Sequence, residues 1–146
     1  MQAWRADFRG IDRGGIRRLR RRCIGDDDRG VPATIPEVHA QCASVEESDL
    51  FGRTFDAVVA SGLMFLRPVD VQALLIHRVA GVLNSNGRFL FTSPQEACAW
   101  HDALTGRDSI SLGSHVYGQI LDAESLRVVG ERFDEGHNHY FFTLKA

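Results

Sequence analysis

The sequence predicts an α/β fold built on two adjacent parallel strands, and three features of its central part carry this prediction. An apolar run at residues 55–60 ends in small residues, a helical pattern follows Pro68, and a second apolar run occupies residues 88–92. Short apolar strands joined by a crossover of this length are expected to be parallel, with a right-handed connection and a ligand site at their carboxyl ends. We therefore expect function around residues 61–65 and 92–94.

The chain has 146 residues, enough for one domain with its own core and too few for two ordinary ones. Its net charge of −2 argues against a general binder of nucleic acid. No apolar run approaches the roughly 18 residues that cross a bilayer, and the charged N-terminus is unlike a signal peptide. Three widely spaced cysteines fit neither a disulfide framework nor a zinc site. We expect a cytoplasmic protein with reduced thiols that binds neither nucleic acid nor membrane.

The helix predicted from Pro68 has one apolar stripe. Proline is favoured in the first turn of a helix, and Asp70 complements the helix dipole there. His77 falls outside the stripe and is expected at the surface. The stripe residues, which recur at helical spacing and are expected to face the core, are Val71, Leu74, Leu75, Val79 and Val82.

The remaining elements are predicted from shorter patterns. Alternation at residues 37–44 predicts a short strand, which a solvated acidic turn at residues 46–49 follows. Two strands with a turn sequence between them are expected to pair as an antiparallel hairpin at the end of the chain. The predicted elements after residue 94 are a helix at 95–104, a loop at 109–114, a helix at 116–121, and strands at 127–133 and 139–144.

Residues 55–59, 63–66 and 87–92 resemble the fourth strand, the loop after it and the fifth strand of the class I S-adenosylmethionine-dependent methyltransferases. The resemblance runs from about residue 37 to residue 145. It implies a Rossmann-like methyltransferase sheet, mostly parallel with a C-terminal antiparallel hairpin, and helices on both faces. At residues 84–87, Asn-Ser-Asn-Gly stands where the family has a Pro-Gly-Gly type turn, and it serves the same backbone need.

The resemblance also implies S-adenosylmethionine as the cofactor. It places the cofactor at the end of the 55–60 strand, where small residues permit close backbone approach, although a tight strand-to-loop turn needs the same residues. Ser44 and Val45 stand where the family often has an Asp near the adenine. The predicted cofactor-binding residues are Ser44, Val45, Ala60, Ser61, Gly62 and Leu63.

A small-molecule acceptor is expected next to the cofactor. Aromatic side chains after the fifth strand equally fit a core under a loop, and the two histidines equally fit a polar hairpin end. No third ligand accompanies the histidines, so we expect no metal. Methyl transfer depends on alignment more than on an acid or base, and the sequence indicates no catalytic residue. The predicted substrate-binding residues are Phe65, Trp100, Tyr117, His137 and His139.

Residues 1–36 do not resemble the family. They hold nine of the sixteen arginines, whereas the single lysine is Lys145, and no family glycine-rich loop is present as written. This segment fits a basic arm for nucleic acid, a disordered tail, or a frameshifted reading of the missing cofactor-binding half. Read one nucleotide out of phase, suitable codons for residues 2–35 encode a Cys-x-x-Gly motif, an amphipathic helix and a strand ending in an acidic residue.

We therefore expect residues 37–146 to be a partial methyltransferase domain, incomplete at its N-terminal side and impaired as written. The rival interpretation is a non-catalytic remnant or interaction module of the same fold. In either case the strand at residues 55–60 lacks its family neighbour, and an open sheet edge invites dimerisation or aggregation.

Limited proteolysis should remove residues 1–35 and leave the remainder resistant, because an out-of-frame or disordered peptide has no packed core. Mass spectrometry of the resistant fragment gives the boundary. A resistant N-terminus would contradict both interpretations, and an extra base near the Pro36 codon in the genomes of close strains would separate them.

Overall fold

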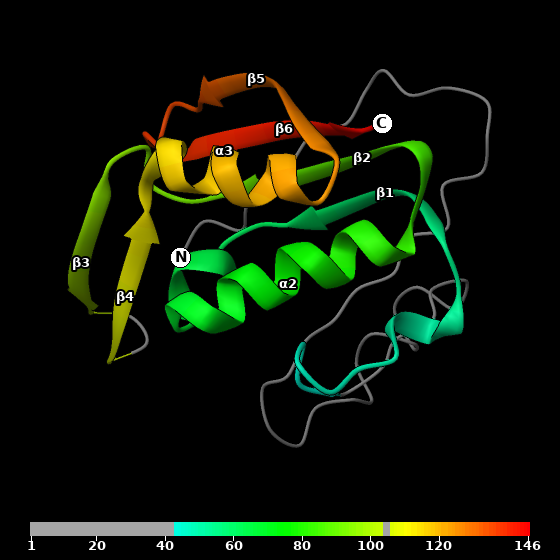
Figure 1. Ribbon diagram of the computed structural model, residues 1–146. Coiled ribbons are helices and arrows are strands. Elements are labelled where there is room, and N and C mark those ends of the chain that lie inside the picture. The colour runs from blue at the N-terminus through cyan, green and yellow to red at the C-terminus, as the bar shows by residue number, and fades with distance from the viewer. Residues whose placement is uncertain (1–42, 104–105) are drawn as a thin grey trace. The chain divides into compact units, whose positions relative to one another are not determined.

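The structure is a computed structural model that describes residues 43–103 and 106–146 (Figure 1). The chain divides into two units, Met1–Ser44 and Val45–Ala146, and the described helices and strands belong to the second unit. The predictions for residues 1–36 and for the strand at 37–44 fall outside the described residues, apart from Ala43 and Ser44. The elements are η1 (Leu50–Gly52), β1 (Phe55–Ala60), η2 (Met64–Leu66), α2 (Val69–Val82), β2 (Leu83–Thr92), β3 (Ala97–Asp102), β4 (Arg107–Leu112), α3 (Gly113–Ala123), β5 (Leu126–Phe133) and β6 (His139–Lys145).

Four strands form one mixed sheet in the order β1-β2-β6-β5. The β1–β2 pair is parallel and is joined through α2, as predicted. The β2–β6 and β5–β6 pairs are antiparallel, which confirms the C-terminal hairpin. The described sheet therefore has one parallel pair and two antiparallel pairs, so the expectation of a mostly parallel sheet is wrong for this part of the chain. Within the described residues β1 pairs only with β2 and forms one edge of the sheet.

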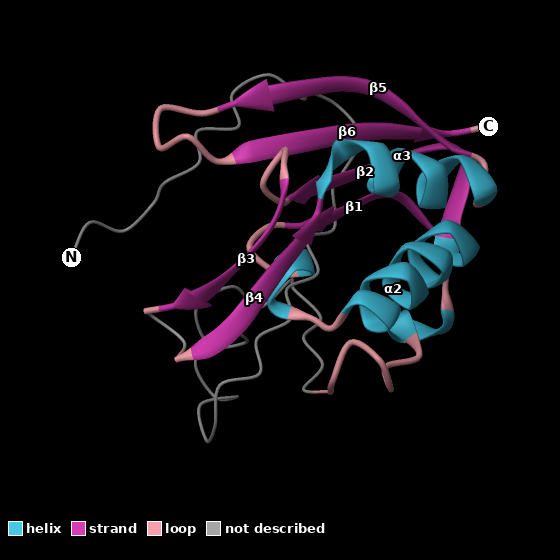
Figure 2. Ribbon diagram, turned by 60° about the vertical axis from the view of Figure 1, so that its left-hand side comes forward, coloured by secondary structure: helices cyan, strands magenta, loops and turns pink. Residues whose placement is uncertain are grey.

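One face of the sheet is buried under both helices. Figures 1 and 2 show α2 and α3 side by side on that face, so helices on both faces are not found in the described part. Phe91 is fully buried and stacks on Phe141 with ring centroids 4.6 Å apart. On the opposite face Val59 of β1 and Phe142 of β6 are exposed. Side chains of a strand alternate between faces, so each strand contributes to the core with every second residue.

The buried face of α2 is rotated from the predicted stripe. Leu75 and Val79 are buried as expected, but Leu74 is 43% exposed. The true stripe follows the spacing of an ideal helix, with a polar residue at its first position. The buried α2 residues are Gln72, Leu75, Ile76, Val79 and Ala80.

No helix in the described ranges is long and apolar enough to span a membrane.

Strands β3 and β4 form a separate two-stranded hairpin, which was not predicted from the sequence. The helix predicted at residues 95–104 and the loop predicted at 109–114 are both wrong, because residues 97–102 pair in antiparallel register with residues 107–112. Alanine and glutamate favour helix, but intrinsic helix propensity is a weak determinant and cross-strand pairing overrides it here. The longer helix α3 includes all of the predicted helix at 116–121.

The turn predicted at residues 84–87 is present as a bulge within β2. The pairing advances two residues along β1, from Phe55 to Ala57, but five along β2. Asn86 takes a left-handed φ of 61°. A Cβ on Gly87 would lie 2.7 Å from Asn84 O, so this position requires glycine.

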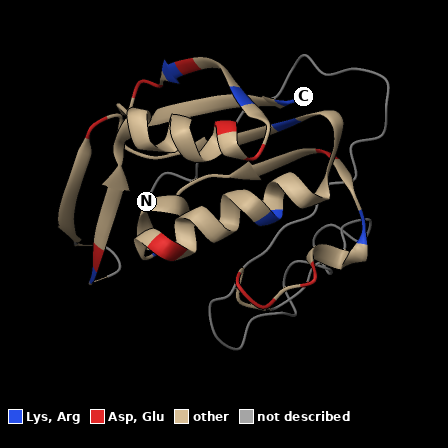
Figure 3. Ribbon diagram, in the orientation of Figure 1, with Lys and Arg blue, Asp and Glu red and all other residues tan. Residues whose placement is uncertain are grey.

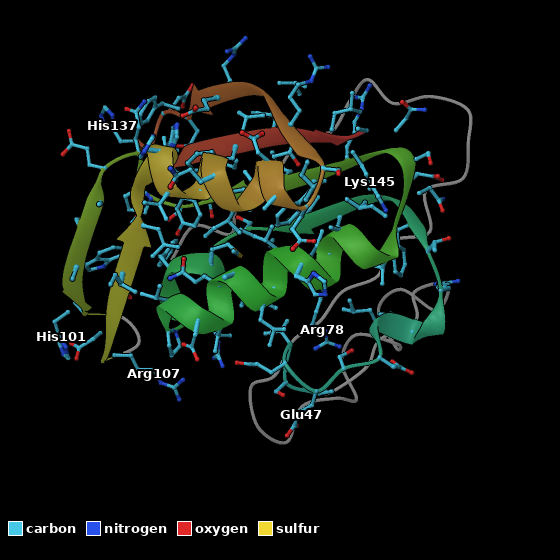
Figure 4. All side chains as sticks on the ribbon, viewed as in Figure 1. Glu47, Arg78, His101, Arg107, His137 and Lys145 are labelled. Carbon is cyan, nitrogen blue, oxygen red and sulfur yellow. The ribbon has the colours of Figure 1, made fainter. Side chains whose placement is uncertain are left out.

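The C-terminal end of α2 is capped by the side chain of Lys145. The ammonium group donates hydrogen bonds to Ala80 O at 2.7 Å and to Leu83 O at 2.8 Å. The last carbonyls of a helix have no partner within the helix and carry the negative end of its dipole, so a cation here is stabilising. The final strand is thereby fixed to the helix (Figure 4).

Leu75→Ala should lower the free energy of unfolding by about 2–5 kcal/mol, because the side chain is 5% exposed and its removal leaves a cavity. Leu74→Ala, one residue earlier on the exposed face, is the matched control and should cost less than about 1 kcal/mol. Urea denaturation followed by circular dichroism measures both. Equal losses in the two variants would show that the assigned helix face is wrong.

Candidate functional site

A cavity of about 500 Å³ lies where β2 ends, between the β3–β4 hairpin and the turn between β5 and β6. Carboxyl ends of strands in open α/β sheets are where ligands bind. Four of the five predicted substrate-binding residues line this cavity, and their role in binding stays a prediction. The lining residues are Phe65, Thr92, Ser93, Pro94, Gln95, Glu96, Cys98, Trp100, Phe133, His137, Asn138 and His139.

Ser93, the first residue after β2, connects the elements that surround the cavity. Its backbone N–H donates to His139 O at 3.2 Å, and its own carbonyl accepts from His139 Nδ1 at 3.2 Å. Its hydroxyl lies 3.1 Å from Ser111 Oγ of β4 and 2.9 Å from Tyr117 Oη of α3. One buried residue therefore fixes β2 to β6, β4 and α3.

Tyr117, the fifth predicted substrate-binding residue, lies in the core instead of the cavity wall. It is fully buried, and its ring meets Phe91 edge-on with centroids 5.3 Å apart. Its hydroxyl donates to Gln72 Oε1 at 2.5 Å. Burial raises the pKa of this phenol above its ordinary value of 10.0, while the hydrogen bond with Ser93 acts in the opposite direction.

Gln72 extends this buried polar network to the hairpin. Its side-chain amide donates to Ile110 O of β4 at 2.9 Å and to Arg67 O at 2.8 Å. Ser111 Oγ donates to Pro94 O at 2.7 Å and accepts from Gly113 N at the start of α3. Since buried polar groups are costly unless they are hydrogen-bonded, this network specifies one position for the hairpin.

His139 is 2% exposed and has an acceptor oxygen at each ring nitrogen. Nδ1 faces the Ser93 carbonyl, so Nδ1 carries a proton. Nε2 lies 2.8 Å from Glu131 Oε2 but forms no hydrogen bond. The ring packs between Phe133 and Phe141, with centroid distances of 4.7 and 4.5 Å. His139 is therefore a fixed wall of the cavity.

His137 is exposed and lies in the turn between β5 and β6, with a φ of 59° (Figure 4). Asp134 organises this turn by accepting from Gly136 N, from Asn138 and from Tyr140 Oη. The Asn138 side chain is the main reason that the pKa of Asp134 is lowered. The turn is thus ordered by internal bonds while His137 lines the cavity.

An aromatic pair in the cavity lining comes from two separate elements. Phe65 lies in the short helix η2, and Trp100 lies on β3. Their ring centroids are 5.3 Å apart with the planes tilted by 44°. Cys98, two residues before Trp100, lines the cavity as well, so alternate residues of β3 face it.

The predicted cofactor residues at the end of β1 lie next to the cavity. Gly62 N donates to Thr92 Oγ1 at 2.7 Å, and Thr92 is a cavity-lining residue. Gly62 has a φ of +65°, and nothing lies within 4 Å of its missing Cβ. Ser61 is also exposed. The described structure therefore leaves open space beside this backbone, which is what close approach of a ligand needs.

Of the predicted cofactor residues before β1, Val45 begins the turn at residues 45–47, and Ser44 belongs to the other unit. Arg78 of α2 holds the turn by donating to Val45 O at 2.7 Å and to Glu46 O and Ser48 O. The acidic turn was predicted to be solvated, but its Glu46 forms an ion pair with Arg67. Figure 4 shows Arg78 between α2 and the turn that carries Glu47.

Several cavity-lining residues, among them Glu96, Cys98 and Phe133, had no predicted role in the site. The alternation of Cys98 and Trp100 is a strand signal that would have placed both on one face. Phe133 ends a predicted strand beside a turn, a position that carried no signal for ligand contact. Among the described residues, no group of three metal-ligating side chains comes together.

No family model and no curated protein matches the sequence. Solved structures do match the fold. They include an N1-methyltransferase of Burkholderia thailandensis bound to 1,6-didemethyltoxoflavin and S-adenosylhomocysteine, with 18% identity, a TM-score of 0.63 and coverage of 75% of this chain and 52% of that chain. An O-methyltransferase family 2 protein of Planctomyces limnophilus in complex with apigenin matches with 14% identity and a TM-score of 0.60, over 76% of this chain and 36% of that chain.

A magnesium protoporphyrin IX methyltransferase of Synechocystis, solved with S-adenosylhomocysteine, matches with 10% identity and a TM-score of 0.58, over 75% of this chain and 52% of that chain. These matches show that the chain has the fold of the class I S-adenosylmethionine-dependent methyltransferases, as the sequence resemblance predicted. The chain spans about half of the length of these structures, or less.

The stability of the protein should fall as the pH rises above about 10. Folded Tyr117 has a raised pKa and holds its proton more tightly than unfolded Tyr117, so deprotonation favours unfolding. Tyr117→Phe should show a shallower loss between about pH 9 and 11, and it should cost about 1–3 kcal/mol at about pH 7 because Gln72 loses its donor. Urea titrations across this pH range test the slope. An unchanged slope in Tyr117→Phe would contradict the assignment.

Proposed function

We propose that this chain is the acceptor-binding part of an S-adenosylmethionine-dependent methyltransferase, with one wall of the cofactor site, and that its acceptor is a small molecule. The observation that carries the proposal is the cavity at the carboxyl end of β2, in a chain with the methyltransferase fold. The N1-methyltransferase with this fold was solved with 1,6-didemethyltoxoflavin and S-adenosylhomocysteine bound. A cavity of about 500 Å³ suits a small-molecule ligand.

The end of β1 fits a cofactor wall. Gly62 presents open backbone in a left-handed conformation, and Thr92 fixes it against the end of β2. We assign the cofactor to residues 60–63 on this side. Val45, whose carbonyl Arg78 holds, is assigned to the adenine side, and the role of Ser44 stays a prediction from the resemblance.

The bound cofactor would supply a methyl group on a sulfonium, and the protein must place the acceptor atom in line with it. Phe65 and Trp100 would position the acceptor from one side, and Phe133 and His139 from the other. The Ser93 carbonyl oxygen lies at one nitrogen of His139 and a Glu131 carboxylate oxygen lies at the other. This ring would therefore orient the methyl-accepting molecule and would not remove its proton. His137, which is exposed at the cavity, is the imidazole able to exchange a proton with the acceptor.

We further propose that the chain as written binds the cofactor poorly. The family resemblance implies a glycine-rich loop near the methionine portion and a carboxylate that accepts hydrogen bonds from both ribose hydroxyls. Neither motif occurs in residues 1–36. Each charge-assisted hydrogen bond is worth about 1.5–3 kcal/mol, so losing two weakens binding by at least about two orders of magnitude.

A non-catalytic interaction module is the second candidate, and the open sheet face supports it. Val59 is 60% exposed and Phe142 is 39% exposed on the face away from the helices. Exposed apolar side chains on a sheet face often mark an interaction site. This candidate requires that the cofactor does not bind at all.

Isothermal titration of S-adenosylmethionine into the chain as written should give a dissociation constant in the high micromolar range or weaker. The same protein with its reading frame restored at Pro36 should bind at least about a hundredfold more tightly, because it regains the ribose carboxylate and the glycine-rich loop. Gly62→Val in the restored protein should weaken binding again, since a β-branched residue is strained at a φ of +65°.

Gly118→Val is the matched control, because Gly118 lies in α3 with open space around its Cβ position and without a positive φ. If the chain as written binds S-adenosylmethionine with micromolar affinity, and restoring the reading frame does not tighten binding, the proposal that this chain binds the cofactor poorly is wrong. Absence of heat at millimolar ligand in both proteins would favour the interaction module.

A further inference from the structure

We infer that the acceptor is a planar aromatic molecule, neutral or cationic and not anionic. This inference rests on the proposed function, since it identifies the class of ligand that occupies the same cavity. Three observations carry it: two aromatic pairs in the cavity lining, a carboxylate as the fully charged lining group, and the absence of Lys and Arg among the described lining residues.

The first wall is the Phe65–Trp100 pair, contributed by η2 and β3. The second is the pair of Phe133 and His139, whose rings lie 4.7 Å apart and are tilted by 38°. Phe133 is 56% exposed, although it is large and apolar, and it lines the cavity. An exposed aromatic side chain at a cavity mouth gains most when a flat ligand stacks on it.

The walls are fixed before any ligand binds. His139 is held by Ser93 and faces Glu131, and the turn that carries His137 is ordered by Asp134. The hairpin that carries Trp100 is attached through Gln72 and Ser111. Rigid walls favour a rigid ligand, because neither partner then loses much conformational freedom on binding.

The charges of the described cavity lining disfavour anions. Glu96 is an exposed carboxylate at the rim. The basic residue of the β3–β4 hairpin, Arg107, lies at the hairpin tip and is not among the lining residues (Figures 3 and 4). Arg132, whose side chain donates to Glu131 O at 2.8 Å, is not among them either. A phosphate or carboxylate on the ligand would meet Glu96 without a compensating cation in this described lining.

Titration calorimetry with four bicyclic probes tests the inference in the absence of cofactor. At about pH 8, where an ordinary imidazole is neutral, N-methylquinolinium and 2-naphthol should bind. Because of Glu96, 2-naphthoate should bind about threefold more weakly than 2-naphthol and about tenfold more weakly than N-methylquinolinium. 2-Decalol, the saturated counterpart of 2-naphthol, should also bind about five- to tenfold more weakly, since it cannot stack.

Two variants assign the effects to residues. Phe133→Ala should weaken both aromatic probes by about five- to tenfold, whereas Phe142→Ala, an exposed aromatic of the opposite sheet face, should leave them unchanged. Glu96→Gln should weaken N-methylquinolinium and strengthen 2-naphthoate by about threefold each and leave 2-naphthol unchanged. Thermal melting of each variant checks that it is folded.

Equal binding of 2-naphthoate and N-methylquinolinium, or of 2-decalol and 2-naphthol, would overturn the inference. So would a Phe133→Ala variant that binds as the parent does. Because no probe requires S-adenosylmethionine, these outcomes are independent of the cofactor titration. Binding of the probes without binding of the cofactor would support the inferred ligand class and contradict the proposed methyl transfer.

Discussion

The four hydrogen-bonding contacts of Ser93 determine where the central strand of this sheet ends and what surrounds that end. Its backbone pairs with His139 in both directions, and its hydroxyl meets Ser111 and Tyr117. All of these groups are buried, so moving any one element would leave polar atoms without partners at a cost of about 1–3 kcal/mol each. The cavity exists where it does because the end of β2 cannot shift relative to β4, β6 or α3.

The polar network and the aromatic core support each other. Phe91, two residues before Ser93, stacks on Phe141 and meets Tyr117 edge-on. The Tyr117 ring therefore packs in the core, and its hydroxyl contacts Ser93. A core of Phe rings alone would tolerate small sliding motions, whereas hydrogen bonds tolerate them poorly. The aromatic rings thus provide most of the burial, and the hydroxyls and Gln72 select one arrangement from several of similar packing.

Sequence patterns identified the parallel β1–β2 pair, α2, α3 and the terminal hairpin because each has a strong local signal. The face of α2 was misassigned because Gln72, a polar residue, is fully buried on the stripe, and its role depends on Ile110 and Tyr117 far along the chain. The β3–β4 hairpin was missed because residues 97–102 have weak preferences that pairing overrides. Similarly, Trp100 and His139 could be proposed for a site, but Phe133 could be found only from the packing of the turn.

The capping of α2 by the only lysine of the chain has a practical consequence. The Lys145 ammonium is engaged by Ala80 O and Leu83 O, so an amine-reactive reagent reacts with it only after these two hydrogen bonds break. Its rate of acylation would therefore measure how often this cap opens, with no competing lysine signal. The sequence thus contains a built-in chemical reporter of local opening at the strand that also carries His139.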